Sequence, residues 1–239
     1  MSFDFTTEAA PVDETAPTTS DVTLALRAGG QATPNGAPTL LTWVTEDNAT
    51  AAEDLVHQVQ RRQSVPRGWS GWGDVGTVTG AESLDRDENP LGRAVQYRVR
   101  TTDQAGNLSD WAESNVISIS MIDEKAFSAP SWSRVKVGGS LGGHVYRSST
   151  AGAVATLAFT GDGVGVVMPT GSGQGTVELC VDHGTDAQDC SEVNLGALAP
   201  AAQRQVVAVF TGLDSGHHTL RVRVVAGTVN LDAALVSTP

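Results

Sequence analysis

The sequence predicts an all-β chain of two tandem β-sandwich domains. Only 5% of the 239 residues are aromatic and 26 are glycine, and such a composition favours short strands joined by tight turns over long helices. Apolar and polar residues alternate in many short runs, as half-buried strands require. The length fits two domains of about a hundred residues each. We divide the chain into a lead-in (1–17), a first domain (18–122), a linker (123–128) and a second domain (129–239).

The first domain carries strand-length runs in a regular order. A Pro- and Thr-rich stretch precedes the first run, and the last run is followed by the predicted linker. The predicted strands cover residues 21–26, 40–43, 55–62, 97–102 and 116–119. The strand at 97–102 leads into an Asp/Gly/Asn turn and then Trp111, which is the pattern of a half-buried strand ending in a tight turn.

Several of these segments resemble parts of a fibronectin type III domain. The stretch 97–112 resembles its penultimate strand and following turn, Trp43 its core tryptophan, and Trp69-Ser70-Gly71-Trp72 its W-S-x-W edge segment. Tyr97 with Leu91 resembles the tyrosine corner of such sandwiches. The third strand departs from the family, which more often has an aromatic where this chain has His57 or Val59. The resemblance implies a spacer or adhesive module.

Two features of the first domain each have two readings. Trp69 and Trp72 present apolar faces that could stack on a sugar ring, or they pack on arginine or on the domain's own surface. Asp85, Asp87 and Asn89 imitate the first ligands of a calcium loop, but Pro90 stands where the loop needs glycine and no bidentate Glu follows. The alternative for this segment is a solvated loop without an ion.

The second domain also consists of alternating runs. Its predicted strands cover residues 154–159, 164–168, 177–181, 206–210, 220–224 and 229–235. The order of its motifs resembles a jelly-roll module at the C-terminal side of many secreted bacterial, especially actinobacterial, proteins. The matching pieces are Trp132–Arg134, Tyr146–Ala153, Phe159–Val164, Gly173–Asp182, Gly212–Val222 and Val229–Ala233. The resemblance implies a galactose-binding-like β-sandwich, a class that often binds carbohydrate.

Candidate carbohydrate ligands in this domain combine aromatic faces with polar donors and acceptors, as sugar sites do. They are Trp132, Arg134, His144, Tyr146, Gln174 and Asp182. Four of them have a structural alternative: the two aromatics could be core residues, Arg134 could pair with Asp232, and Asp182 could only shape a turn.

Cys180 and Cys190 flank a polar, Gly-containing turn between two alternating runs, which predicts a hairpin. Both sulfurs fall on the face opposite the apolar residues, so they are expected to point outward from one sheet. Directly opposed residues of an antiparallel pair lie close enough for a disulfide. We therefore predict a Cys180–Cys190 bridge and an oxidising compartment, either extracellular or at the cell surface. Reduced thiols, or a metal pair helped by His183, are the alternatives.

The charge and hydropathy of the chain limit the kinds of molecule that it is expected to bind. A formal charge of -12 without a basic patch disfavours nucleic acid and anionic membrane surfaces. The sequence has neither an apolar run of membrane-spanning length nor a visible signal peptide. Alternation at Phe3 and Phe5 after Met1 indicates a fragment of a larger exported protein, with these residues left over from a neighbouring module.

No catalytic constellation stands out. Gly138 to Gly142 matches G-x-S-x-G in form, but no helix follows the serine as a hydrolase requires. Gly171 to Gly175 lacks the Lys-Ser/Thr of a phosphate-binding loop. His217 and His218 alternate on a strand and cannot both face one metal. We expect no catalytic residue, metal or cofactor, apart from the calcium alternative.

The sequence thus predicts a non-catalytic accessory region of a secreted bacterial protein. In this hypothesis the C-terminal domain binds a polysaccharide or cell-surface glycan, the N-terminal domain acts as a spacer, and other domains belong to the parent chain. The alternative is a structural or adhesion module that mediates protein contacts in a surface or phage-tail-like assembly.

Overall fold

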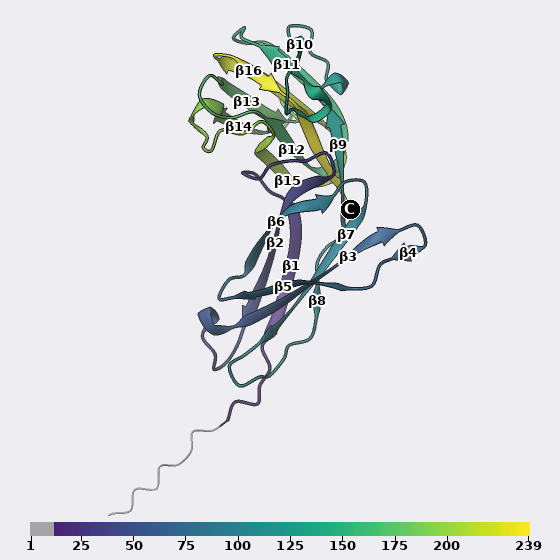
Figure 1. The fold of residues 1–239 in the computed structure, drawn as a ribbon, viewed down its shortest axis with the longest axis vertical. Helices are drawn as coiled ribbons and strands as arrows, with labels where there is room; N and C mark the ends of the chain where they lie inside the picture. The colour runs from purple at the N-terminus through teal and green to yellow at the C-terminus, as the bar shows by residue number, and fades with distance from the viewer. Residues whose placement is uncertain (1–11) are drawn as a thin grey trace, which may run out of the picture.

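The structure is a computed structural model that describes residues 12–239, and Figure 1 shows two stacked units built from β-strands. The predicted all-β, sandwich-like class is confirmed. Helical segments within 12–239 are short 3-10 turns, at Ala52–Asp54, Glu124–Ala126, Leu141–Gly143 and Leu195–Ala197. No described helix has the length and apolar character to cross a membrane. The interpretation of Phe3 and Phe5 lies outside the described residues.

In the first unit, two groups of strands face each other across an apolar core. One group has the order β1 (Thr18–Leu26), β2 (Gly36–Glu46) and β6 (Ser83–Pro90). The other is centred on β3 (Val56–Val65), which pairs with β4 (Gly68–Trp69), β5 (Gly73–Thr79) and β7 (Ala94–Thr102). Strand β7 also pairs with β8 (Ala112–Glu113) and β9 (Ile117–Asp123). Strand β5 and most of β6 were not predicted from the sequence.

The second unit has a small sheet and a large one around its own core. The small sheet has the order β10 (Ser133–Lys136), β11 (His144–Ser148) and β16 (Val229–Leu231). The strands of the large one follow in the order β14 (Asp189–Asn194), β13 (Thr176–Val181), β15 (Gln205–Ala226), β12 (Val154–Met168) and β17 (Ala233–Thr238).

Strand β9 joins the two units into one sheet of 11 strands. It pairs with β7 of the first unit at its start, and with β17 of the second unit from Ser118↔Thr238 to Asp123↔Ala233. The segment 123–128, predicted as a linker, continues from β9 into a 3-10 turn, and its Glu124 and Phe127 are buried. The two units therefore share backbone hydrogen bonds as well as neighbouring positions in the chain.

The end of the large sheet is buried on both faces. In β12, Val166 and Met168 face the core of the second unit, whereas Val167 faces the core of the first. In β17, Leu235 joins the core of the first unit in the same way. Burial on two sides explains why the C-terminal part of β12 and most of β17 are continuously buried, whereas the first part of β12 alternates.

Two pairs of predicted strands in the second unit are in fact single long strands. The runs 154–159 and 164–168 both belong to β12, and the runs 206–210 and 220–224 both belong to β15. The pairing of β12 with β15 shifts register between Gly161 and Gly163. A Cβ at Gly161 would lie 2.2 Å from the carbonyl oxygen of Ser237, so glycine here permits close passage of a neighbouring strand rather than a turn.

The predicted Cys180–Cys190 disulfide is confirmed. The two residues lie directly opposite each other on β13 and β14, with their Cα atoms 4.1 Å apart. Cys190 is exposed, but Cys180 is buried rather than pointing into solvent. The difference arises because β13 is an inner strand between β14 and β15, whereas β14 is at the sheet edge.

Candidate functional site

Arg134, His144 and Tyr146 of the predicted sugar ligands lie on the small sheet of the second unit, and Trp132 immediately precedes its strand β10. Arg134 is directly opposite Tyr146 in the pairing of β10 with β11. Trp132 is 8% exposed and packs in the core, where its indole N–H has no hydrogen-bond partner among residues 12–239. Arg134 donates from Nε to Oε1 of the buried Glu124 at 2.7 Å, so its ion-pair partner is Glu124 rather than Asp232. Trp132 therefore offers no open ring face to a ligand.

Gln174 and His144 are each held by different neighbours. Oε1 of Gln174 accepts a hydrogen bond from Nδ2 of Asn230 at 2.8 Å, and Oδ1 of Asn230 accepts one from Nε of Arg147 at 2.7 Å. His144 is partly exposed at the start of β11, with Nδ1 3.4 Å from the carbonyl oxygen of Gly142. Neither residue is joined to the Arg134 and Tyr146 group by a hydrogen bond within the described chain.

Asp182 forms an ion pair with His218 of β15. Nδ1 of His218 is 2.6 Å from Oδ2 of Asp182, and its Nε2 is 2.7 Å from the carbonyl oxygen of Asp214. Both partners accept, so the imidazole satisfies both only when it is protonated. The hydrogen bond to Asp182, reinforced by that to Asp214, raises the pKa of His218. Burial acts to raise the pKa of Asp182, but hydrogen bonds from His218 and Thr219 outweigh it and the pKa is lowered.

In the first unit, tryptophans and arginines interleave on the outer face of β3, β7 and the neighbouring segments. We call this the tryptophan–arginine ladder. Guanidinium carbons lie 4.2 to 5.0 Å from the ring centroids, within the range of a cation–π contact. The order along the ladder is Trp69, Arg62, Trp72, Arg98, Trp111 and Arg100. Packing of the edge tryptophans on arginine, one of the two readings of the sequence, is confirmed.

Glutamine side chains fix the arginines of the ladder. Arg98 donates from Nε to Oε1 of Gln60, and Arg100 donates from Nε to Oε1 of Gln58, each at 2.9 Å. In both cases the pair is formed between neighbouring strands β3 and β7. Because each guanidinium is held in its plane by such contacts, the ring positions of the ladder are preorganised.

Trp69 is the terminal ring of the ladder and the most exposed large aromatic of the described chain, at 40%. Trp72 and Trp111 are each contacted by two guanidinium groups, whereas Trp69 is contacted by that of Arg62 alone. A tryptophan ring has two faces. One face of Trp69 is therefore left without a guanidinium partner in the described structure.

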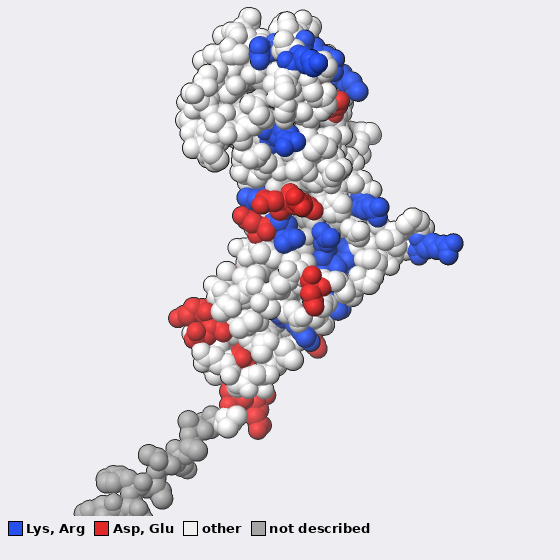
Figure 2. Space-filling view, viewed as in Figure 1, with Lys and Arg blue, Asp and Glu red and all other residues white. Residues whose placement is uncertain are grey.

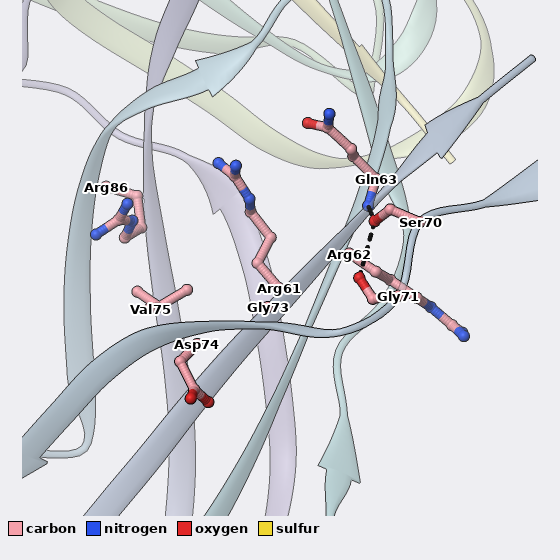
Figure 3. Close-up of a pocket in the computed structure, with 9 residues that line it drawn as sticks. All are labelled: Arg61, Arg62, Gln63, Ser70, Gly71, Gly73, Asp74, Val75 and Arg86. Carbon is pink, nitrogen blue, oxygen red and sulfur yellow. Dashed lines mark hydrogen bonds between the residues drawn. The ribbon is translucent and has the colours of Figure 1, made fainter.

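A cleft with a volume of about 320 Å³ opens at the edges of the two sheets, and Trp69 is not among the residues that line it. Its walls come from β3, from β5, from the loop that contains Ser70 and Gly71, and from Arg86 of β6 in the opposite sheet. We call it the arginine cleft, because Arg61, Arg62 and Arg86 line it. Figure 3 shows Arg61 and Arg86 on one side of the β5 segment, with Arg62 extending to the other side of β3.

The three arginines of the cleft differ in whether they have an ion-pair partner among the described residues. Arg62 forms an ion pair with Glu113 at 3.3 Å, whereas Arg61 and Arg86 form none with residues 12–239. Nε of Arg86 is buried without a hydrogen-bond partner. Figure 2 shows Lys and Arg atoms gathered over the middle of the molecule, where β2, β6 and β3 lie, beside a group of Asp and Glu.

The candidate calcium ligands lie in strand β6 rather than in a loop. Asp85 and Asp87 both contact the guanidinium of Arg27, with 3.3 Å between Asp85 Oδ2 and Arg27 Nη1. Asn89 is 1% exposed and points inward, where its Oδ1 accepts a hydrogen bond from the hydroxyl of Tyr97 at 2.7 Å. The hydroxyl of Tyr97 thus bonds to a side chain eight residues upstream, which is a variation on the expected tyrosine corner.

Some features of the ladder and of the cleft could be recognised in the sequence. Gln58, Gln60 and Arg62 alternate on β3, and Arg98 and Arg100 alternate on β7, so polar faces of two strands were visible. Their pairing was not, because it depends on the register of β3 with β7. Arg86 was read as part of a loop, so its position opposite Arg61 could not be found.

Comparison with known proteins gives no family. No protein-family model matches the chain, and no curated protein matches it. Similar solved structures include a two-domain esterase (CEX) active on acetylated mannans, at 12% identity and a TM-score of 0.40, covering 50% of this chain and 36% of that one. A family 6 carbohydrate-binding module has 10% identity and a TM-score of 0.34, covering 50% and 92%.

A xanthan lyase from Paenibacillus is 13% identical with a TM-score of 0.40, covering 94% of this chain and 25% of that one. The chain thus spans about a third of the esterase and a quarter of the lyase. TM-scores of this size establish neither a shared fold nor a shared ligand.

Proposed function

We propose that the chain is a non-catalytic accessory region of an exported bacterial protein and that it binds carbohydrate. The observation that carries the proposal is the ring face of Trp69 that no guanidinium covers, at the exposed end of the tryptophan–arginine ladder. Sugar sites combine an aromatic face, which packs on the C–H groups of the ring, with a few fixed polar groups. The ladder holds Trp69 in place before the ligand arrives, which lowers the entropic cost of binding.

This proposal locates the main sugar contact in the first unit, whereas the sequence pointed to the second. The reason is the exposure of the aromatics: Trp69 is 40% exposed and Trp132 is 8% exposed. Tyr146, which is partly buried beside Arg134, is the remaining aromatic of the predicted group. Substitution of Tyr146 therefore tests whether the sugar binds to the second unit instead.

Three structural features support the wider proposal. The arrangement of β1-β2-β6 opposite the strands around β3 supports a fibronectin type III-like first unit. The two sheets around the core of the second unit support a galactose-binding-like jelly roll. The Cys180–Cys190 disulfide supports an oxidising, extracellular setting.

The edges of the sheets argue against the alternative of assembly by strand addition. Edge strand β14 carries Asp189 and Glu192, and edge strand β10 carries Arg134 and Lys136. Charged side chains on edge strands discourage pairing with another chain. Large exposed apolar side chains among residues 12–239 are scattered rather than gathered into a patch.

The test is binding of the full chain to a panel of soluble polysaccharides by affinity electrophoresis. The variants are Trp69→Ala, Tyr146→Ala and, as a matched control, Leu108→Ala, which removes an apolar side chain of 49% exposure from the turn after β7. We expect Trp69→Ala to weaken binding by about tenfold or more, because one stacked aromatic contributes roughly 1–2 kcal/mol. Tyr146→Ala and Leu108→Ala should bind like the wild type.

Loss of binding in Tyr146→Ala alone would return the site to the second unit. No retardation by any polysaccharide, together with self-association of the chain in solution, would replace carbohydrate binding with the assembly alternative. Circular dichroism of each variant checks that it is folded.

A further inference from the structure

We propose that the arginine cleft binds the carboxylate of an acidic saccharide, with Arg61 and Arg86 as its ligands. This inference rests on the proposed carbohydrate-binding function and names the substrate class. It begins with the position of Arg61. His57 and Val59 point into the core from β3, and Arg61 follows at the same alternating spacing, so it faces the space between the sheets.

Arg86 faces the same space from the other sheet. It is opposite Thr39 in the pairing of β6 with β2, and Thr39 is completely buried. Both arginines are partly buried. Two positive side chains thus line one cleft from opposite walls, at the position where the apolar core of the first unit ends.

These two guanidinium groups lack the partners that other arginines of the chain have. Arg27 contacts two carboxylates and Arg134 contacts the buried Glu124, but neither Arg61 nor Arg86 has an ion pair or a side-chain hydrogen bond in the described chain. A partly buried cation without a counter-charge is unfavourable, and an anion between the two would remove that cost.

The carboxylate that lines the cleft does not fill this role. Oδ1 of Asp74 accepts hydrogen bonds from Nε2 of Gln60 at 2.7 Å and from Nε2 of Gln58 at 3.2 Å. Figure 3 shows Asp74 pointing away from Arg61 and Arg86. Asp74 is therefore held on the outer face, and the inner part of the cleft stays positively charged.

A saccharide carboxylate fits this arrangement better than a free anion. The planar guanidinium group binds a carboxylate through two parallel hydrogen bonds, and the polar residues Gln63 and Ser70 line the same cleft, where the hydroxyl groups of the sugar can hydrogen-bond. The volume of about 320 Å³ is at the lower end of the range for small-molecule sites. The formal charge of -12 repels polyanions at long range, so selectivity must come from contacts inside the cleft.

The experiment uses the full chain and matched pairs of polysaccharides. Polygalacturonate, alginate and glucuronoxylan are each compared with their carboxyl-reduced neutral forms by isothermal titration calorimetry. The variants are Arg61→Gln and Arg86→Gln, and the control is Arg67→Gln, which makes the same charge change at an exposed turn outside the cleft. Thermal melting verifies that each variant folds.

We expect at least one acidic form to bind about tenfold or more tightly than its reduced partner, as charge-assisted hydrogen bonds allow. Arg61→Gln and Arg86→Gln should each remove most of that preference, whatever their effect on the affinity for the neutral form. Arg67→Gln should keep the preference.

Equal binding of the acidic and neutral forms, unaffected by either variant, overturns the inference and leaves carbohydrate binding intact. A preference for the acidic form that survives both variants also overturns it, because the carboxylate is then read elsewhere. Failure of every acidic and neutral form to bind overturns the proposed function, and the inference with it.

Discussion

His218 links protonation to the fold of the second unit. Its two ring nitrogens face Asp182 Oδ2 and the carbonyl oxygen of Asp214, and the first of these contacts raises its pKa above the ordinary value. The charged form is thus favoured in the folded state. The stabilisation is complete below the unfolded pKa of about 6.5 and is lost as pH rises through the folded pKa.

We therefore predict that His218→Gln flattens the fall in stability above about pH 6.5 that the wild type shows. The measurement is the free energy of unfolding by urea between pH 5 and pH 9. His217→Gln is the control, because within residues 12–239 the side chain of the neighbouring His217 bonds to the hydroxyl of Thr160 and to no carboxylate. An identical pH dependence in wild type and His218→Gln would contradict the assignment.

Asp232 changes stability with pH in the same direction as His218, but in a lower pH range. It is completely buried, and burial, with the nearby charge of Asp123, raises its pKa to about 7, although a hydrogen bond from the Leu141 N–H acts against this. Its proton is released at lower pH in the unfolded chain, at about 4. The folded state binds more protons in this window, so stability decreases as pH rises from about 4 to about 7.

Asp232→Asn should remove this loss. The amide oxygen can still accept from Leu141, so we expect the variant to gain on the order of 2 kcal/mol over the wild type at pH 8 and little at pH 4. Chemical unfolding at the two pH values measures the gain. Asp186→Asn, at an exposed turn, is the control, and an equal effect at both pH values would rule out titration of Asp232 as the cause.

At the scale of elements, the disulfide closes the edge of the large sheet. It links β13 to the outermost strand β14 across a sequence separation of 10 residues. Closing a loop of this length stabilises the folded state by roughly 2.5–3 kcal/mol in the chain-entropy model. Reduction, or the double change Cys180→Ser and Cys190→Ser, should lower the free energy of unfolding by about that amount, and unchanged stability after complete reduction would contradict this.

The sequence predicted those strands that have one apolar face and one polar face. Strands β1, β3 and β7 were predicted because apolar and polar residues alternate in them. Strands β5 and β6 were missed because they are edge strands with charged and glycine residues, which look like loops. The breaks predicted within β12 and β15 followed from glycines such as Gly161, whose role is close strand passage and not a turn.

The candidate site was harder to predict than the strands. The disulfide needed only local register, and it was confirmed. The choice between Trp132 and Trp69 as a sugar platform depends on burial, which tertiary packing sets and a single sequence does not reveal. The pairing of Arg61 with Arg86 across two sheets likewise depends on non-local geometry.

At the scale of the whole molecule, the two units share a sheet and a core. Leu235 and Val167 of the second unit pack with Val22 and other core residues of the first, and β9 pairs with β17. We therefore predict a single cooperative thermal transition for the chain. Leu235→Ala should lower the melting temperature of that one transition, since a buried Leu→Ala change costs about 2–5 kcal/mol. Two separate calorimetric transitions would contradict a shared core.

The central claim is that carbohydrate is held at the open face of Trp69. The chain has five tryptophans, so its indole N–H signals can be followed individually by ¹⁵N NMR during titration with an oligosaccharide from the best-binding polysaccharide. We predict a saturable shift of the Trp69 signal, a smaller one for Trp72, and none for the buried Trp43 and Trp132. A saturable shift confined to Trp132, or to backbone signals around Tyr146, would contradict the account.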